Sequence, residues 1–446
     1  MTDHTSDDIN PITDRNTDHT SDGIDVNIVG CGIGGLTAAA LAASRGLRVR
    51  LFDTRHTPGR AETRQHEGFA LNRGPHALYR AGHLSRILSS LGIAPTGAVP
   101  KLGVGTVGQR VGAMPGTPST VLRTRLLPAR SKPRLARFMT AQLPRFNAEE
   151  LATTTVDAWL DDVAAGHPEL RTTLWGLLNL VTYNAASDIA SADAAVEQLR
   201  LAADTGVIYV DRGWASIADG LRATLGPDVQ HVAGEVIAVT EDDGATIVTT
   251  SDGRRLNAGT TIIAAGLPAV ADRLLDTDGA LVRAAGPPVE AATLDIGLRG
   301  NVGTPTRFGL DRALYASVHS IAAGIAPAGH SVLSVARYRQ PDEDVDVRTS
   351  REQLRSFGRE AGVDDSDVVM ERYLHCVPVA GGMPTAANGG LSGRPPTTAP
   401  DRQRTFLVGD WVGDRGLLAD AAAASAEDAI GGVGRVLTDR SATMAA

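Results

Sequence analysis

The hydrophobic pattern predicts its first strand at residues 26–29, a short run rich in β-branched residues. A glycine-rich segment follows, and the alanine- and leucine-rich stretch 36–43 predicts a helix that ends near Gly46, a residue type typical of helix C-terminal caps. The apolar run 49–52 predicts a second strand, which ends at Asp53. The order strand, glycine-rich turn, helix and strand is typical of nucleotide-binding α/β domains.

Two long blocks of the remaining chain differ in pattern. Residues 84–204 have a mostly helical pattern, whereas residues 286–399 mix strands and loops that are interrupted by glycine and proline pairs. Outside these blocks the apolar runs predict strands at 235–239, 246–250, 261–266 and 405–408, and a helix at 417–430.

Composition and charge narrow the class of protein. The chain has 446 residues, enough for two or three domains, and its net charge of −8 argues against nucleic-acid binding, which needs clustered positive charge. Two distant cysteines, Cys31 and Cys376, suggest neither a disulfide framework nor a metal site. Without a signal peptide or a run of about 18 apolar residues, we expect a cytoplasmic protein.

The first 24 residues contain six Asp and one Arg and include an imperfect repeat, at 2–7 and 17–22. A repeat of His and Asp residues could bind a metal ion. However, the segment has too few apolar groups to fold by itself. We therefore predict that residues 1–24 are a disordered acidic tail without a metal site.

The glycine-rich segment after the first strand fits the pattern G-x-G-x-x-G. Gly30 permits the tight turn, Gly32 lets the backbone approach a pyrophosphate, and Gly35 lets helix and strand pack closely. The helix N-terminus presents free N–H groups to the phosphates. Asp53 follows Gly35 by 18 residues, where a carboxylate can bind the ribose hydroxyls. This context predicts a dinucleotide site that excludes a 2′-phosphate.

A second G-x-G-x-x-G occurs at Gly103, Gly105 and Gly108. Gly112, Pro115 and Pro118 follow, so no helix is expected to begin there. We interpret this match as a chance pattern in a loop or at a strand edge.

The residues after Asp53 distinguish FAD from NAD. The stretches 58–63 (Pro-Gly-Arg-Ala-Glu-Thr) and 68–76 (Gly-Phe-Ala-Leu-Asn-Arg-Gly-Pro-His) resemble two elements of the FAD-dependent amine oxidase and phytoene desaturase superfamily. Pro58 and Asn72 depart from the family pattern, which has Gly and Asp there. The resemblance implies that Arg60 and the loop of Gly74 lie along the pyrophosphate and the flavin.

Two further segments share the resemblance. The three strands at 235–266 resemble the family's meander and return strand, which implies that the Val236 backbone lies over the adenine. Gly409 and Asp410 resemble the second flavin motif, in which the Asp binds the ribityl chain and the next helix faces the flavin. The predicted FAD-binding residues are Gly30, Gly32, Gly34, Gly35, Asp53, Arg60, Gly74, Val236, Gly266, Gly409, Asp410 and Leu418, and the FAD is predicted to be non-covalent.

These observations predict an α/β fold with a Rossmann-like FAD-binding domain of the two-dinucleotide-binding type and a discontinuous α+β substrate domain. The FAD-binding domain is assigned to 25–83, 205–285 and 400–436. The substrate domain is assigned to 84–204 and 286–399, with a C-terminal tail at 437–446.

The substrate domain gives few chemical signals. Aromatic residues make up only 4% of the chain, and candidates for the site are Tyr183, Tyr209, Tyr315, His319 and Trp411. By resemblance, His76 and Trp411 lie beside the flavin. We expect His76 either to take a proton during substrate oxidation or only to hydrogen-bond its surroundings.

Two other features have alternative interpretations. Seven basic residues and no acid occur within 123–145, which predicts either a peripheral membrane contact or an exposed helix face; the second is the more usual outcome. Cys376 precedes Asp410 by 34 residues and could tether FAD, but the flanking residues do not resemble an attachment motif. A buried free thiol is therefore expected.

The sequence favours an FAD-dependent oxidoreductase, a dehydrogenase, desaturase or oxidase that transfers a hydride from a largely apolar small molecule to flavin. Alternatives are an amine oxidase, a flavin-dependent isomerase or reductase, and a prenyl-protein binding module of the same fold. The complete set of flavin-binding residues argues against the last. No second nucleotide motif has strand–turn–helix context, so oxygen or a quinone-like molecule is the expected electron acceptor.

Overall fold

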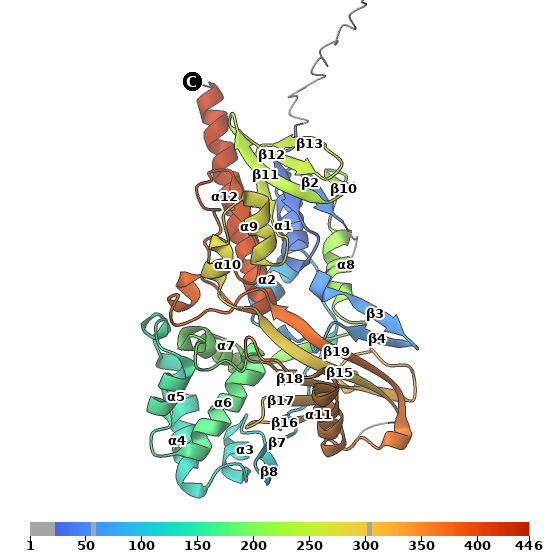
Figure 1. The fold of residues 1–446 in the computed structure, drawn as a ribbon, viewed down its shortest axis with the longest axis vertical. Helices are drawn as coiled ribbons and strands as arrows, with labels where there is room; N and C mark the ends of the chain where they lie inside the picture. Colours follow the sequence, from blue (N-terminus) through green and yellow to red (C-terminus); the bar gives the residue numbers. More distant parts are fainter. Residues whose placement is uncertain (1–22, 55–58, 301–305, 446) are drawn as a thin grey trace, which may run out of the picture.

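The computed structural model describes residues 23–54, 59–300 and 306–445. In Figure 1 a nucleotide-binding part occupies the upper half and a second part, made of a large sheet and a group of helices, occupies the lower half. The predicted tail at 1–24 lies almost wholly outside the described residues.

The nucleotide-binding part is built on a five-stranded parallel sheet. Its strand order is β10-β2-β1-β14-β20. The strands are β1 (Val26–Val29), β2 (Val49–Asp53), β10 (Val229–Ala233), β14 (Thr260–Ile263) and β20 (Thr405–Leu407). They come from three segments far apart in the sequence, which confirms the predicted Rossmann-like α/β architecture.

Helices cover one face of this sheet, and their small and apolar side chains are buried against it. α1 (Ile33–Ser44) is buried from Gly35 to Ala42, and α12 (Leu418–Ala445) packs beside it through Ala423, Ala426 and Ala429 (Figure 1). Small side chains let the two helices approach closely. α2 (His83–Ser90) and α8 (Ala215–Ala223) complete this layer.

A smaller sheet covers the other side of the nucleotide-binding part. It is an antiparallel meander of β11 (Val236–Asp242), β12 (Ala245–Thr250) and β13 (Arg255–Ala258). α9 (Pro268–Leu275) and α10 (Ala280–Ala285) pack with it in one apolar cluster.

The second part contains a seven-stranded sheet with the order β19-β15-β18-β17-β16-β7-β8. Its strands are β7 (Val104–Val107), β8 (Arg110–Ala113), β15 (Val289–Arg299), β16 (Thr306–Gly309), β17 (Leu314–Val318), β18 (His330–Tyr338) and β19 (Val368–Ala380). α11 (Val347–Glu360) packs on this sheet, where Leu354 and Phe357 are fully buried. The long strands β15 and β19 are antiparallel and extend toward the nucleotide-binding part (Figure 1).

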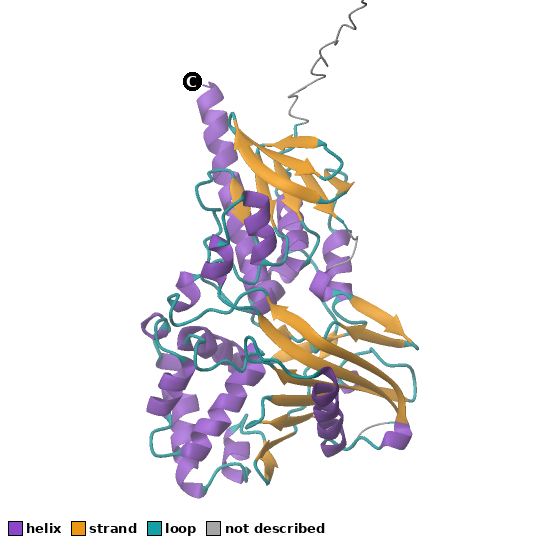
Figure 2. Ribbon diagram, in the orientation of Figure 1, coloured by secondary structure: helices purple, strands orange, loops and turns teal. Residues whose placement is uncertain are grey.

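A helical group stands beside this sheet, at the lower left of Figure 2. Its core includes Phe138, Trp159, Leu170 and Leu174. The helices are α3 (Pro118–Arg123), α4 (Lys132–Arg137), α5 (Val156–Val163), α6 (Pro168–Thr182) and α7 (Ala192–Asp204).

Short strands join the two parts. β3 (Thr63–His66) pairs with β4 (Phe69–Asn72) as a hairpin. β9 (Val207–Val210) pairs with both β5 (Leu78–Tyr79) and β6 (Gly97–Ala98). β4 and β5 therefore flank the loop that carries Gly74 and His76.

The block 84–204, for which a mostly helical pattern was predicted, also contains β7 and β8, which add to the large sheet. The second glycine motif spans β7, and a Cβ at Gly103, just before this strand, would lie 2.1 Å from the Thr306 carbonyl oxygen. Residues 437–445 continue α12, so they are not a tail; their alanine and polar residues extend the helix without a breaker. Among the described residues, no helix is long and apolar enough to span a membrane.

Candidate functional site

The glycine loop between β1 and α1 has the geometry of a nucleotide-binding turn. Gly30 has φ of +110°, and a Cβ there would lie 2.4 Å from the Ala264 carbonyl oxygen. A Cβ at Gly35 would lie 1.9 Å from the Gly30 oxygen, so both positions require glycine. In contrast, a Cβ at Gly32 would meet nothing within 4 Å. Gly32 therefore presents open backbone at the start of α1, where no side chain caps the helix.

Gly30 and Gly32 line one large cavity of about 660 Å³, a volume within the range of small-molecule and cofactor sites, whereas Gly35 packs behind the loop and does not line it. At one end lie the glycine loop, Asp53 at the end of β2, and Glu235 and Val236 at the start of β11. Cys31 lies beside Asp53. Burial, and then the Asp53 carboxylate, raise the pKa of the Cys31 thiol to about 12, so it stays protonated at neutral pH.

An ion pair forms part of the cavity wall. The Arg60 Nη1 donates to Asp410 Oδ2 at 2.5 Å, and Asp410 Oδ1 accepts from the Gly381 N–H at 3.1 Å. Arg60 also donates to the carbonyl oxygens of Val379 and Gly266. The structure thus brings together two side chains that are 350 positions apart, both predicted FAD ligands.

The second flavin motif adopts the expected strand–turn–helix arrangement. Gly409 and Asp410 follow β20, and α12 begins at Leu418, whose φ is +56°. Gly409, Asp410 and Leu418 all line the cavity, together with Gly34 and Gly266. A Cβ at Gly266 would meet nothing within 4 Å, so this backbone is also open to the cavity.

His76, on the loop between β4 and β5, also lines the cavity. Its Nδ1 lies 2.9 Å from the Gly74 carbonyl oxygen, which can only accept, so a neutral ring carries its proton on Nδ1 and its lone pair on Nε2. Burial is the main cause that lowers the pKa of His76, and the Arg60 and Arg372 charges lower it further. The carbonyl groups of Gly74 and Arg60 act in the opposite direction, because they stabilise the protonated ring.

Trp411 does not belong to this site. It is fully buried in the cluster formed with β11, β12 and α9, and it is not among the residues that line the cavity. The prediction that Trp411 is catalytic is therefore wrong: the chain turns after Asp410 and directs the indole into the core. Cys376 is also outside the cavity, and it is an exposed free thiol, not the buried one expected.

Of the other aromatic candidates, one lines the cavity and three do not. Tyr183 lines the cavity. Tyr209, Tyr315 and His319 instead form a buried hydrogen-bonded cluster, with 2.6 Å between the two tyrosine oxygens and 2.7 Å from Tyr315 to His319 Nε2. Burial lowers the pKa of His319 to about 3, so this cluster is neutral.

The sequence interpretation did not identify several cavity residues. Trp214 packs against His76 with ring centroids 5.0 Å apart, and Ala291, Thr293 and Val377 come from β15 and β19. No local motif marks the last three, because they are alternating residues of ordinary strands. The sequence signal at Trp214 is its place directly after Gly213, a glycine with φ of +80° at the end of the β9 segment.

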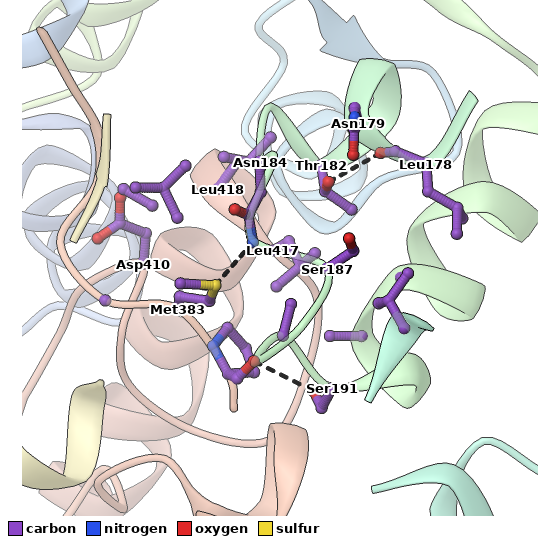
Figure 3. A pocket seen from close by; sticks show the side chains of 18 residues that line it. Leu178, Asn179, Thr182, Asn184, Ser187, Ser191, Met383, Asp410, Leu417 and Leu418 are labelled. Atoms are coloured by element: carbon purple, nitrogen blue, oxygen red, sulfur yellow. Dashed lines mark hydrogen bonds between the residues drawn. The ribbon is translucent and has the colours of Figure 1, made fainter. Parts of the chain in front are cut away.

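A much smaller cavity, of about 40 Å³, adjoins the large one at Asp410 and Leu418 (Figure 3). It is lined mainly by α6, α7 and the loop at Met383, and the Asn184 amide donates to the Met383 sulfur at 2.7 Å. This volume has room for a few water molecules only.

Comparisons with known proteins agree with this geometry. Residues 28–91 match the model of the NAD(P)-binding Rossmann-like domain. An oxidoreductase from Methanosarcina mazei has a similar structure, with a TM-score of 0.71 at 17% identity over 91% of this chain and 99% of that one. Cyclohexylamine oxidase from Brevibacterium oxydans matches with a TM-score of 0.67 at 16% identity, covering 93% of this chain and 99% of that one.

Putrescine oxidase bound to putrescine also matches, with a TM-score of 0.67, 16% identity and coverage of 92% and 98%. The chain therefore shares the fold of these two amine oxidases. The fold implied by the sequence resemblance is thereby confirmed. A comparison with curated protein sequences finds no match. At these identities the amine oxidase fold is shown, whereas the reaction and the substrate are not.

Proposed function

We propose that this protein is an FAD-dependent oxidoreductase that removes a hydride from an organic substrate. One observation carries the proposal: a single cavity runs from the nucleotide-binding glycine loop to the buried, neutral His76. Such a cavity has room for a dinucleotide at one end and for a reacting molecule at the other.

The described residues fit FAD. The open backbone at Gly32 and the uncapped start of α1 suit the pyrophosphate, and Asp53 suits the adenosine ribose. Arg60 and Asp410 would hold the central part of the cofactor, and the start of α12 suits negative charge on the flavin. No cysteine except Cys31, at the nucleotide end, is among the residues that line the cavity, which supports non-covalent binding.

His76 would take up the proton of the reaction. When bound, FAD would supply the acceptor for a hydride from a substrate carbon. The substrate must also lose one proton, and His76 Nε2 would accept it. The carbonyl groups of Gly74 and Arg60 would then stabilise the protonated ring. Oxygen or a quinone-like molecule would be the final acceptor of the electrons taken from the substrate.

A peripheral membrane contact at 123–145 is part of this proposal. Some basic residues of the segment have partners within the protein: Arg134 donates to the Val163 carbonyl oxygen, and Arg130 pairs with Glu169. Leu122, just before the segment, is 72% exposed, which suits an apolar contact beside positive charge. Binding to anionic vesicles at low salt would support this contact.

An absorbance spectrum tests the proposal directly. The purified or FAD-reconstituted protein should show flavin bands, and acid precipitation should leave FAD in the supernatant. Asp53→Ala should weaken FAD binding by about 10-fold or more, because a hydrogen bond to a charged group contributes about 1.5–3 kcal/mol. A colourless protein that cannot be reconstituted would contradict the proposal.

A further inference from the structure

The end of the cavity near His76 forms a chamber whose walls come from both parts of the molecule. We define the chamber by the residues that line it there, which are His76, Leu78, Tyr79, Tyr183, Trp214, Ala291, Thr293, Val377, Pro378 and Val379. Most of these side chains are apolar and none is acidic. A molecule bound in the chamber would therefore be enclosed largely by hydrocarbon.

Tyr183 is the unusual member of this wall. It ends α6 in the left-handed conformation, with φ of +59° and ψ of +24°, which is uncommon for a bulky residue. Strained backbone of this kind persists where the surrounding structure fixes it, often at ligand sites. Here the Tyr183 ring packs edge-on against Tyr338, with centroids 5.7 Å apart.

The Tyr183 hydroxyl is available to a ligand. Within the described residues it makes no hydrogen bond, whereas the neighbouring Tyr79 donates to the Val181 carbonyl oxygen at 2.9 Å. Tyr183 lies deep in the protein and yet retains accessible surface, which it presents to the cavity. Burial raises the pKa of this phenol well above 10, so the group remains a neutral hydrogen-bond donor.

The acidic residues that line the cavity are engaged elsewhere or lie at its other end. Asp410 pairs with Arg60, and Glu62 pairs with Arg64 at 3.0 Å. Asp420 accepts from the Leu84 N–H at 2.8 Å. The remaining two, Asp53 and Glu235, lie at the nucleotide end. An ammonium group in the chamber would thus lack a counter-ion, and burying an unpaired charge is costly.

The charged groups next to His76 provide no free carboxylate either. Arg60 lines the cavity and is paired with Asp410. Arg372, whose charge acts on His76, is paired with Asp295.

Resting on the proposed function, we propose that the chamber accepts an uncharged, largely apolar substrate that presents an oxygen acceptor to the Tyr183 hydroxyl. Tyr183 is then a specificity-determining residue. This substrate class differs from the diamine bound by the structurally similar putrescine oxidase.

Two probes of equal ring size test this assignment on the FAD-loaded protein: cyclohexanone, a neutral acceptor, and cyclohexylamine, a cation at pH 7. Binding is followed by the perturbation of the flavin absorbance. We expect cyclohexanone to bind at least 10-fold more tightly than cyclohexylamine. Tyr183→Phe removes only the hydroxyl and should weaken cyclohexanone binding about 2- to 10-fold, the range of one neutral hydrogen bond.

Tyr373→Phe is the matched control, because Tyr373 bonds His375 on β19 and does not line the cavity. It should leave the affinity for both probes unchanged. Equal or tighter binding of the amine, the absence of a response to both probes, or an unchanged ketone affinity in Tyr183→Phe would overturn the assignment. The flavin content is measured first, so a failure of cofactor binding is recognised separately.

Discussion

At the scale of single residues, His76 combines two properties that suit a proton acceptor. The Gly74 carbonyl oxygen fixes the tautomer, and burial together with the Arg60 and Arg372 charges keeps the ring neutral. A neutral imidazole with its lone pair at Nε2 can accept a proton without first losing one. The two carbonyl groups beside it favour the ring once it is protonated.

The pH dependence of substrate oxidation should report this environment. Because the pKa of His76 lies below its ordinary value of 6.5, the neutral ring should persist, and the rate of flavin reduction should stay high, to pH values below 6.5. His76→Gln should slow single-turnover reduction at least about 100-fold, the usual contribution of a general base, and should abolish the acid limb. An unchanged rate and pH profile in this variant would show that His76 only shapes the site.

At the scale of elements, the loop of Gly74 and His76 is held by contacts from a distant strand. Arg372 on β19 donates to the carbonyl oxygens of Leu71 and Asn72, at the end of β4, and pairs with Asp295 on β15. Ser334 on β18 completes this group by donating to Asp295 at 2.8 Å. The large sheet of the second part therefore positions the loop of Gly74 and His76, although the sequence motif assigned this loop to the FAD-binding domain.

A second contact between elements joins α12 to α2. Asp420, in the first turn of α12, accepts a hydrogen bond from the Leu84 N–H in the first turn of α2. Burial raises the pKa of Asp420 from 3.8 to about 6. A pKa that is higher in the folded state means that the folded protein loses stability as the pH rises from about 4 to about 6, and does not regain it above pH 6.

Asp420→Asn should remove this penalty, because the amide oxygen can still accept from Leu84 and carries no charge. At pH 8 we expect the variant to be more stable than the wild type by about 1–3 kcal/mol, with a smaller difference at pH 5. Denaturant unfolding at both pH values measures this. Asp219→Asn, an exposed control on α8, should change stability by less than about 0.5 kcal/mol at either pH. A loss of stability at pH 8 in Asp420→Asn would mean that the charge itself stabilises the contact.

At the scale of the whole molecule, the cavity is shared between the two parts. The glycine loop and α12 form its nucleotide end, whereas β15, β19 and the end of α6 close the chamber. A ligand that spans both ends connects elements from most of the sequence. FAD binding should therefore stabilise both parts together, by a free energy that grows with the logarithm of the ratio of FAD concentration to Kd.

The composition of residues 1–22, which precede the described part of the chain, predicts that they are dispensable for folding. A chain that begins at Gly23 should keep the melting temperature and the flavin content of the full protein. Thermal unfolding monitored by flavin fluorescence compares the two chains. Loss of FAD or precipitation of the shorter chain would assign the acidic segment a structural role.

The sequence by itself determined the nucleotide-binding half of the site. Gly30, Gly32, Gly35 and Asp53 are recognisable because a strand, a turn and a helix form one local unit with fixed spacing. Arg60 and Asp410 were found by resemblance, each within its own short motif. That these two side chains form an ion pair depends on how the chain returns after 350 residues, and no local pattern specifies it.

Only the tertiary structure decided which side chains enclose the chamber. Tyr183, Thr293 and Val377 lie on three elements that meet at the cavity, whereas Trp411, one position from a predicted ligand, turns into the core. β7 and β8 join the large sheet despite a helical pattern around them, because β7 pairs with β16, which lies about 200 residues later, and β8 pairs with β7. Periodicity and motifs report contacts between near neighbours in the chain, and the chamber consists of contacts between distant ones.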